Sequence, residues 1–214
     1  MSIKISGGKK ENGIVVGNSY DKYAAKNPIV RWMMNGFESS LSELVAKTAP
    51  QTIHEIGCGE GYWVIRWNKQ GLNARGCDFS EQVIEMAMEN AFEAEIKTPI
   101  FKTRSIYDVN FEEDSADLVV CCEVLEHLED PEAGLESLKK IAKDYVILSV
   151  PREPLWCTLN LARGKYIKDL GNTPGHLQHW SKKSFITLVE KYFTVIEVKS
   201  PLPWTMLLCR QRQG

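Results

Sequence analysis

Strand-like and helix-like segments alternate five times along the middle of the chain, between residues 52 and 151. Short apolar or β-branched runs stand at 52–56, 73–78, 99–104, 116–124 and 145–150, and helical patterns separate most of them. Strands that alternate with helices in this way pair in parallel, and the helices cover the sheet. We therefore expect an α/β fold with a doubly wound, mostly parallel sheet and helices on both faces.

The segments that flank this core complete a single domain over residues 1–214. Helical periodicity over 28–47 predicts one or two helices before the first strand, and we expect 1–18 to be a flexible lead-in. Residues 151–181 are too long for an ordinary turn and predict a lid insert beside the substrate. A helix over 184–193 and two strands over 194–200 and 204–210 follow, and we expect the two strands to form a hairpin at the sheet edge.

Composition excludes several classes of protein. With 43% hydrophobic residues, a net charge of −2 and no basic tail, the chain is not expected to bind nucleic acid. The first residues lack the apolar region of a secretory signal, and no apolar run is long enough to span a bilayer. The six cysteines form no CxxC pair, so we expect buried, reduced thiols in a cytoplasmic protein and no zinc site built from cysteine pairs.

Candidate ligand-binding residues follow the predicted strands directly. A glycine loop, "GCGEG" at 57–61, follows the first strand, and Asp78, Ser105 and Glu123 follow the next three. In a doubly wound sheet, ligands bind at the carboxyl ends of the strands. These residues are therefore expected to lie together at one edge of the sheet.

The spacing of the glycine loop favours a nucleoside ligand without a pyrophosphate. Its third glycine comes one place too early for the dinucleotide fingerprint GxGxxG. Asp78, at the end of the second strand, is placed to accept hydrogen bonds from ribose hydroxyls. The alternative is a tight structural turn with no ligand.

Four stretches together resemble the class I S-adenosylmethionine-dependent methyltransferases: "HEIGCGEG", "GCDFS", "FEEDSADLVVCCEVLEHLEDP" and "YVILSVP". The likeness is to the small-molecule branch that includes the ubiquinone-pathway O-methyltransferases. It covers residues 52–151, and the segment 175–193 is similar as well. The resemblance implies a Rossmann-like methyltransferase fold and S-adenosyl-L-methionine as the cofactor.

The resemblance also implies roles for single residues. Glu55 and the Gly57 backbone would hold the methionine amino group, Asp78 would bind the ribose diol, and Glu123 would lie beneath the cofactor. Ser105 stands where relatives often carry an aspartate that pairs with adenine, so its hydroxyl would have to replace that contact. The other residues expected around the cofactor are Tyr20 (or Tyr23), Cys58, Gly59, Phe79 and Ile106.

Methyl transfer to a hydroxyl needs a base, and histidine is the side chain suited to that task near neutral pH. Of the four histidines, His54 is expected to be a core residue and His127 to lie where the methyl group emerges. His176 and His179 are spaced i, i+3, which on one helix turn could bind a metal; we favour capping or pocket lining. The candidate catalytic residues are His127, Glu123, His176 and His179.

The motif E-x-x-E-H at Glu123, Glu126 and His127 leaves a second mechanism open. In the ubiquinone-pathway enzymes that this motif resembles, these positions are associated with a divalent cation. Such a cation could lower the pKa of a phenolic acceptor. We favour a metal-free pocket, with His127 as base or orienting group, and keep the cation as the alternative.

The insert bears on the substrate. Over residues 155–168 apolar side chains precede Arg163, Lys165 and Lys168, a pattern typical of a lid or of a helix that touches a membrane surface. The expected function is O-methylation of a phenolic, quinol or lipid-like hydroxyl. The alternatives are an N- or C-methyltransferase, a non-catalytic protein that binds S-adenosylmethionine, and an NAD-dependent oxidoreductase.

Overall fold

A seven-stranded sheet forms the centre of the computed structural model, which describes residues 3–11, 14–18, 20–96, 99–164 and 166–212. Its strand order is β5-β4-β3-β6-β7-β9-β8; the first five strands are parallel, and β9 runs antiparallel to both neighbours. The strands are β3 (Thr52–Ile56), β4 (Asn73–Asp78), β5 (Phe101–Thr103), β6 (Ala116–Cys122), β7 (Ala142–Pro151), β8 (Phe193–Lys199) and β9 (Trp204–Gln211). The doubly wound sheet and the closing hairpin are as the sequence predicts.

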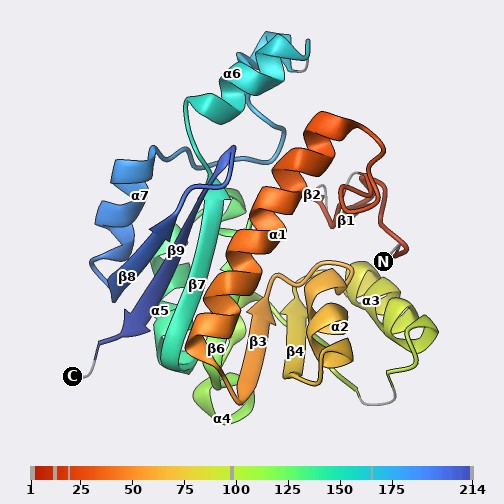
Figure 1. Ribbon diagram of the computed structural model, residues 1–214, viewed down its shortest axis with the longest axis vertical. Helices are drawn as coiled ribbons and strands as arrows, with labels where there is room; N and C mark the ends of the chain where they lie inside the picture. The colour runs from red at the N-terminus through yellow and green to blue at the C-terminus, as the bar shows by residue number, and fades with distance from the viewer. Residues whose placement is uncertain (1–2, 12–13, 19, 97–98, 165, 213–214) are drawn as a thin grey trace.

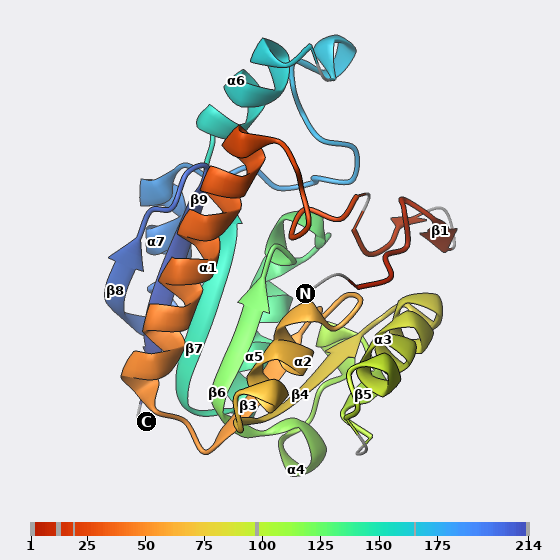
Figure 2. The same cartoon turned by 45° about the vertical axis from the view of Figure 1, so that its right-hand side comes forward.

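Helices cover both faces of this sheet (Figures 1 and 2). One core joins the sheet to the first three helices, and a second core joins it to α5 and α7 on the other face. The helices are α1 (Pro28–Thr48), α2 (Tyr62–Lys69), α3 (Glu81–Glu93), α4 (Phe111–Asp114), α5 (Pro131–Ile141), α6 (Leu155–Ala162) and α7 (Lys182–Val189), with 3-10 turns η1 (Ile106–Asp108), η2 (Leu125–His127) and η3 (Ile167–Asp169). The predicted helical region 28–47 is therefore one helix.

Short polar side chains begin most of these helices. Ser80, Asp130 and Ser181 each accept a backbone N–H of the first turn of α3, α5 and α7, respectively. Such caps satisfy donors that have no partner inside the helix. The caps fix where each helix begins, and the parallel pairing of β3 to β7 places the carboxyl ends of these strands at one edge of the sheet.

β3 is the point at which the chain reverses its winding direction. It pairs with β4 on one side and with β6 on the other, and the crossovers from these strands leave in opposite directions. At such a switch point the loops after neighbouring strands separate and open a ligand site. The glycine loop follows β3, and Glu123 follows β6.

The N-terminal segment that we predicted to be a flexible lead-in is instead packed on the domain. We call residues 3–11 and 14–18 the N-terminal strap; residues 1–2 and 12–13 lie outside the described structure. The strap contains the short pair β1 (Lys10–Glu11) and β2 (Ile14–Val15). Its Lys4 N–H donates to Asn90 Oδ1 over 2.8 Å, and Ser6 is 5% exposed. These long-range contacts explain why no local pattern revealed the strap.

The insert stands on the carboxyl end of the sheet, above α1 (Figure 1). It leaves β7, forms α6 and η3, and returns along residues 172–180 to an isolated bridge between Arg152 and Trp180. Lys165, one of its predicted basic residues, lies outside the described structure. Among the described residues, no helix combines the length and apolar character that crossing a bilayer requires.

Candidate cofactor and acceptor site

The glycine loop is fastened to the end of β4. The Gly57 and Cys58 N–H groups donate to the Cys77 carbonyl over 2.8 and 2.9 Å. Gly59 N–H donates to Asp78 Oδ2, and Ser80 N–H donates to Asp78 Oδ1, each over 3.1 Å. Burial raises the pKa of Asp78, while these N–H groups favour its ionised form. Asp78 is 9% exposed and lies beside the loop. Its carboxylate oxygens keep lone pairs that can accept hydrogen bonds from a ligand.

Glu55 places a buried carboxylate beside this loop. It lies in β3 just before the loop, is 4% exposed, and its Oε2 has no hydrogen-bond partner among the described residues. Burial raises the pKa of Glu55 well above its usual value, and the Asp78 carboxylate adds to this effect. A buried acceptor of this kind costs free energy unless a donor reaches it, so it marks a place for a ligand's donor group.

Two glycines in the loop have different reasons to be glycine. A side chain at Gly57, whose φ is +76°, would collide with Val124. At Gly59 (φ +53°) the nearest atom to an added Cβ would be Asn18 Nδ2, 3.9 Å away. Gly57 is therefore required by packing, whereas Gly59 faces space that a ligand can use.

The residues predicted near adenine lie along the neighbouring strand ends. Phe79 is 48% exposed and Ile106 is 6% exposed. The Ser105 hydroxyl accepts the Tyr107 N–H over 3.3 Å and so caps η1. Its proton remains available for donation, while one of its two lone pairs is used.

The two tyrosines named for the methionine side behave differently. Tyr20 is 54% exposed. Tyr23 stacks on Tyr62 with ring centroids 3.6 Å apart, and its hydroxyl accepts from Trp63 Nε1 over 3.1 Å. Its pKa is raised well above the usual value by burial and by the charge of Glu55.

Glu123 is held by two side chains from other strands. Ser149 Oγ donates to its Oε1 over 2.9 Å, and Trp204 Nε1 donates to its Oε2 over 2.6 Å. The residue has φ +60°, which is unusual for a side chain other than glycine and is typical of strained functional positions. Burial raises the pKa of Glu123 to about 7. The two hydrogen bonds fix the Glu123 carboxyl at the mouth of β6.

His127 has a defined proton arrangement. Its Nδ1 lies 2.8 Å from the Gly175 carbonyl of the insert. A carbonyl only accepts, so Nδ1 carries the proton and Nε2 of the neutral ring keeps a free lone pair. Partial desolvation lowers the pKa of His127 below its usual 6.5. The ring is therefore neutral at pH 7, and its Nε2 is able to accept a proton.

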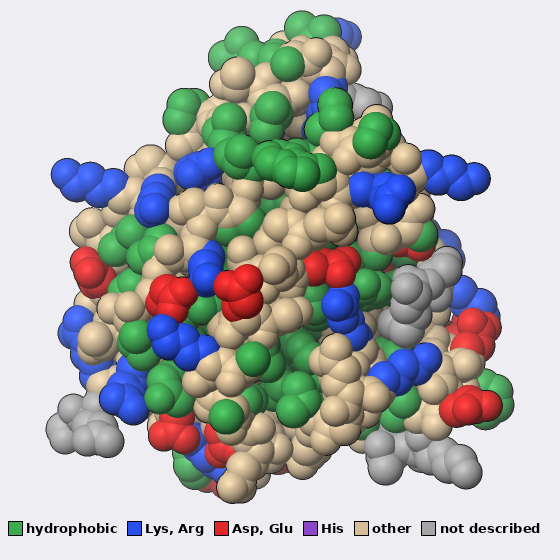
Figure 3. All heavy atoms as spheres, in the orientation of Figure 1, with side chains coloured by type: hydrophobic (Ala, Val, Ile, Leu, Met, Phe, Trp, Pro, Cys, Tyr) green, Lys and Arg blue, Asp and Glu red, His purple; other side chains and the backbone are tan. Residues whose placement is uncertain are grey.

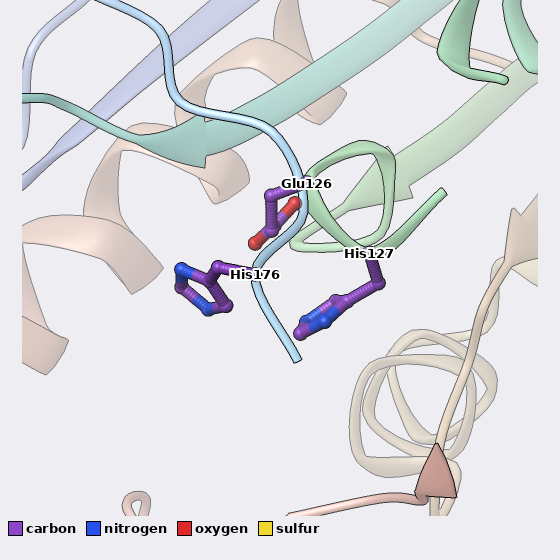
Figure 4. A group of neighbouring side chains, drawn as sticks. All are labelled: Glu126, His127 and His176. Atoms are coloured by element: carbon purple, nitrogen blue, oxygen red, sulfur yellow. The ribbon is translucent and has the colours of Figure 1, made fainter. Parts of the chain in front are cut away.

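Glu126, His127 and His176 converge on one space between η2 and the insert (Figure 4). One ligand atom from each lies within 4.8 Å of the others. Glu126 is 2% exposed, and its Oε2 has no hydrogen-bond partner in the described chain. His176 stands edge-on to His127, with centroids 4.9 Å apart, and stacks on Trp156 at 5.9 Å. Burial and two neighbouring imidazoles lower the pKa of His176 to about 3.

The metal site on one helix turn, which the spacing of His176 and His179 allowed and which we did not favour, does not form. The two residues lie in an irregular segment instead of on a helix turn. His176 joins Glu126 and His127, whereas His179 lies near Glu153 and Cys157. His54 is a core histidine as predicted: it is 2% exposed, and its Nδ1 is 2.7 Å from the Asp114 carbonyl.

Three contributors to the site were not found from the sequence. Glu60 is 1% exposed and accepts the Ser6 and Asn18 N–H groups over 3.0 and 2.7 Å, so it anchors the strap beside the loop. Lys22 lies with its Nζ 5.5 Å from the centroid of the Tyr23 ring, and its charge opposes the rise in pKa of Glu55, Glu123 and Glu126. Trp204 comes from the far end of the chain. Of these three residues, only Glu60 could have been noticed in the sequence, because it is an acidic residue inside the glycine loop.

A family model described as a methyltransferase domain matches residues 54–149. The match runs from β3, through the glycine loop, Asp78 and Glu123, to β7. Residues 54–149 are thus similar in sequence to a methyltransferase domain. The N-terminal strap, α1 and the insert lie outside the matched segment.

Curated relatives carry the description ubiquinone biosynthesis O-methyltransferase. The protein of Hydrogenovibrio crunogenus is 30% identical over 93 residues, which cover 44% of this chain and 39% of that protein. The protein of Alkalilimnicola ehrlichii is 24% identical over 149 residues, covering 64% of this chain and 60% of the relative. The chain thus matches less than two thirds of the length of these relatives.

Solved structures share the fold of the methyltransferase domain and its flanks. Magnesium protoporphyrin IX methyltransferase from Synechocystis PCC 6803, solved with bound SAH, superposes with a TM-score of 0.68 at 20% identity, covering 91% of this chain and 94% of that one. An N-methyltransferase of Bradyrhizobium japonicum superposes with a TM-score of 0.61 at 16% identity, covering 88% and 99%. The seven-stranded sheet with its closing hairpin is therefore a methyltransferase fold.

Proposed function

We propose that this chain binds S-adenosyl-L-methionine at the carboxyl ends of β3 and β4 and transfers its methyl group to a small molecule. The observation that carries the proposal is the buried Oε2 of Glu55, which has no hydrogen-bond partner in the described part of the chain, beside the fastened Asp78 and the open face of Gly59. The ammonium group of an amino acid suits Glu55, and the diol of a ribose suits Asp78. The space beside Gly59 leaves room for the body of the ligand. The matched family model and the fold support the same reading.

In this proposal, different residues around the loop bind different parts of the cofactor. Glu55 and the Gly57 backbone hold the methionine end, Asp78 accepts the ribose hydroxyls, and Gly59 with Cys58 leaves room for the nucleoside. Phe79, Ile106 and the Ser105 hydroxyl form the adenine side, and Tyr20 and Glu123 complete the set around the methionine side. The bound cofactor supplies an activated methyl group on a sulfonium, so the protein has to align the acceptor and exclude water.

His127 is the group we propose as the base. Its Nδ1 is tied to Gly175, which leaves Nε2 able to take a proton from an acceptor hydroxyl. Its lowered pKa keeps the ring neutral at pH 7. His176 shapes the same wall, because it packs against both His127 and Trp156. His179, the fourth catalytic candidate, lies with the second cluster, at the base of the insert.

We propose a phenolic, quinol or lipid-like hydroxyl as the acceptor, since a neutral imidazole suits a weakly acidic hydroxyl. The names of the curated relatives favour O-methylation. N-methylation is the second candidate, favoured by the N-methyltransferase among the solved structures. A divalent cation held by Glu126, His127 and His176 is an alternative way to activate the acceptor, because those three groups converge.

A turnover experiment tests the proposal. The purified chain is incubated with methyl-labelled S-adenosylmethionine and a panel of phenols, quinols, amines and lipid alcohols, and products are identified by mass. A labelled O-methyl product supports the base mechanism, and its loss with a chelator would favour the cation. Cofactor binding without any labelled product would indicate a non-catalytic binding protein.

We also propose that the top of the molecule contacts an anionic membrane surface. Large apolar side chains are exposed at the start of α1 and across the insert: Ile29, Trp32, Leu161, Ile167 and Leu170 are 67%, 62%, 41%, 64% and 79% exposed. Figures 1 and 2 both place α6 above the N-terminal end of α1, so these residues share one end of the molecule. We call this set of five residues the apical patch.

Charge around the apical patch favours an anionic partner. Lys26, Arg31, Arg163 and Lys168 are exposed near it and make no ion pair within the described chain; Asp169 is the acidic neighbour. In Figure 3 the upper part of the molecule shows hydrophobic and basic side chains, and acidic ones are visible only lower down. Exposed apolar residues ringed by cations are typical of interfacial binding to lipids. The insert would then be a lid that opens toward a lipid-like acceptor.

Co-sedimentation with vesicles tests this contact. The chain should pellet with vesicles that contain anionic phospholipid, less so at high salt, and the double variant I29S/W32S should stay in the supernatant. Phe92→Ser is the matched control, since Phe92 is 83% exposed on α3, far from the patch in sequence. No binding to anionic vesicles at low salt would refute the contact. The six unpaired cysteines support a reducing, cytoplasmic location for such a peripheral protein.

A further inference from the structure

Three segments of the insert meet at its base, on the side of β7. The Glu153 N–H donates to the Trp180 carbonyl over 2.9 Å, next to the bridge between Arg152 and Trp180. These bonds hold the returning segment beside the exit of β7. Because of them His179 faces Glu153, while α6 brings Cys157 to the same carboxylate.

The three side chains approach one another at ligand distances. Glu153 Oε1 is 3.2 Å from Cys157 Sγ and 3.6 Å from His179 Nδ1. One ligand atom from each residue lies within 4.8 Å of the other two. In a tetrahedral zinc site with ordinary bond lengths, ligand atoms are separated by about 3.4–3.6 Å. The cluster is therefore close to the spacing that one metal ion requires.

We propose that Glu153, Cys157 and His179 form a binding site for a divalent transition-metal ion of the zinc type. A carboxylate oxygen, a thiolate sulfur and an imidazole nitrogen are the donors that zinc uses in proteins. The site is separate from the methyl-transfer site and does not depend on the proposed function.

The exposure of the ligands suits an ion that also keeps a water molecule. The side chains of Glu153 and His179 are 13% and 39% exposed, so the ion can enter from solvent and a fourth position stays open. Without metal, burial and the Glu153 carboxylate raise the pKa of the Cys157 thiol to about 11. Binding consequently forms a metal–sulfur bond and releases the thiol proton to the buffer.

The location gives the ion a structural role. It would join α6 to residues 172–180 of the insert. These elements also carry Trp156 and His176, which lie beside the proposed acceptor site. Trp156 is next to Cys157 and stacks on His176. A bound ion would thus fix the insert in the arrangement that positions His176 against His127.

Cobalt(II) is the probe that distinguishes this site from the other cluster, because only this one contains sulfur. We expect the full chain to bind one Co²⁺ with a thiolate-to-cobalt charge-transfer absorption, which Zn²⁺ then abolishes by displacement. Cys157→Ser should remove the absorption, and His179→Ala should weaken binding at least about tenfold. Cys122→Ser, the other half-buried free cysteine, and His127→Ala should keep both the absorption and the affinity.

Several outcomes would overturn the site. Absence of the charge-transfer absorption in the wild-type chain would do so. So would an absorption that survives Cys157→Ser and disappears in Cys122→Ser. Cobalt binding without that absorption, abolished by His127→Ala, would place the ion at Glu126, His127 and His176 instead. Circular dichroism of Cys157→Ser, an almost isosteric change, shows that the loss does not come from unfolding.

Discussion

Replacing Glu60 by alanine is expected to release the N-terminal strap from the glycine loop. The Glu60 carboxylate is 1% exposed and accepts three N–H donors: Ser6 N at 3.0 Å, Asn18 N at 2.7 Å and Asn18 Nδ2 at 2.5 Å. Asn18 is also the residue nearest to the open face of Gly59. Loss of this anchor should therefore loosen the cover of the loop and weaken cofactor binding.

The size of the effect follows from the number of bonds. Hydrogen bonds to a charged group contribute about 1.5–3 kcal/mol each, so three additive bonds would contribute about 4.5–9 kcal/mol. The true loss lies toward the lower end, because a released strap can bond to water. A loss of about 4 kcal/mol corresponds to about a 10³-fold change in the equilibrium for local opening. Glu60→Gln should lose less, since its amide can still accept the two backbone N–H groups.

Hydrogen exchange measures this opening directly. In Glu60→Ala the amides of Ser6 and Asn18 should exchange at least about 10²-fold faster, while those of β3 and β6 stay protected. Glu89→Ala is the control: its side chain is 60% exposed and pairs with Lys4 of the same strap, and such surface ion pairs contribute little to stability. Unchanged exchange at Ser6 and Asn18 in Glu60→Ala would refute the anchoring role.

Three further predictions concern the loop and the histidines. Gly59→Val should abolish cofactor binding measured by calorimetry, whereas Gly164→Val, at a similar φ and with none of the described residues within 4 Å of an added Cβ, should bind the cofactor normally. His127→Ala should lower turnover by about 10²–10⁴-fold at unchanged cofactor affinity, and the wild-type rate should decline only below pH 6.5, because the pKa of His127 is lowered. His54, with a pKa of about 4, binds its proton only on unfolding, so the free energy of unfolding should fall by about 3 kcal/mol from pH 7 to pH 4, and less in His54→Gln.

The parts of the fold that local patterns determine were predictable. β3 and β6 are buried on both faces, and their apolar sequences therefore indicate strands. Ser80 and Asp130 are typical N-cap residues and indicate where α3 and α5 begin. Asp78 could be placed because the end of a parallel strand fixes its edge of the sheet. Its bond to Gly59, 19 residues away, follows from the same geometry.

Contacts between distant segments left no such pattern. Trp204 reaches Glu123 across 81 positions, Gly175 reaches His127 across 48, and the strap reaches Glu60 across 54. Each depends on the tertiary arrangement of an insert, a hairpin or a terminus. Two residues spaced i, i+3, such as His176 and His179, are neighbours only when they lie on a helix. The segment that contains them is not helical.

Calorimetric titration of the full chain with S-adenosyl-L-methionine tests the central claim most directly. We expect one molecule to bind per chain, NAD to give no heat and no competition, and Asp78→Ala to weaken binding by about 1–3 kcal/mol through loss of the ribose hydrogen bonds. No binding by the wild-type chain, or equal affinity in Asp78→Ala, would contradict the assignment of the site at the ends of β3 and β4.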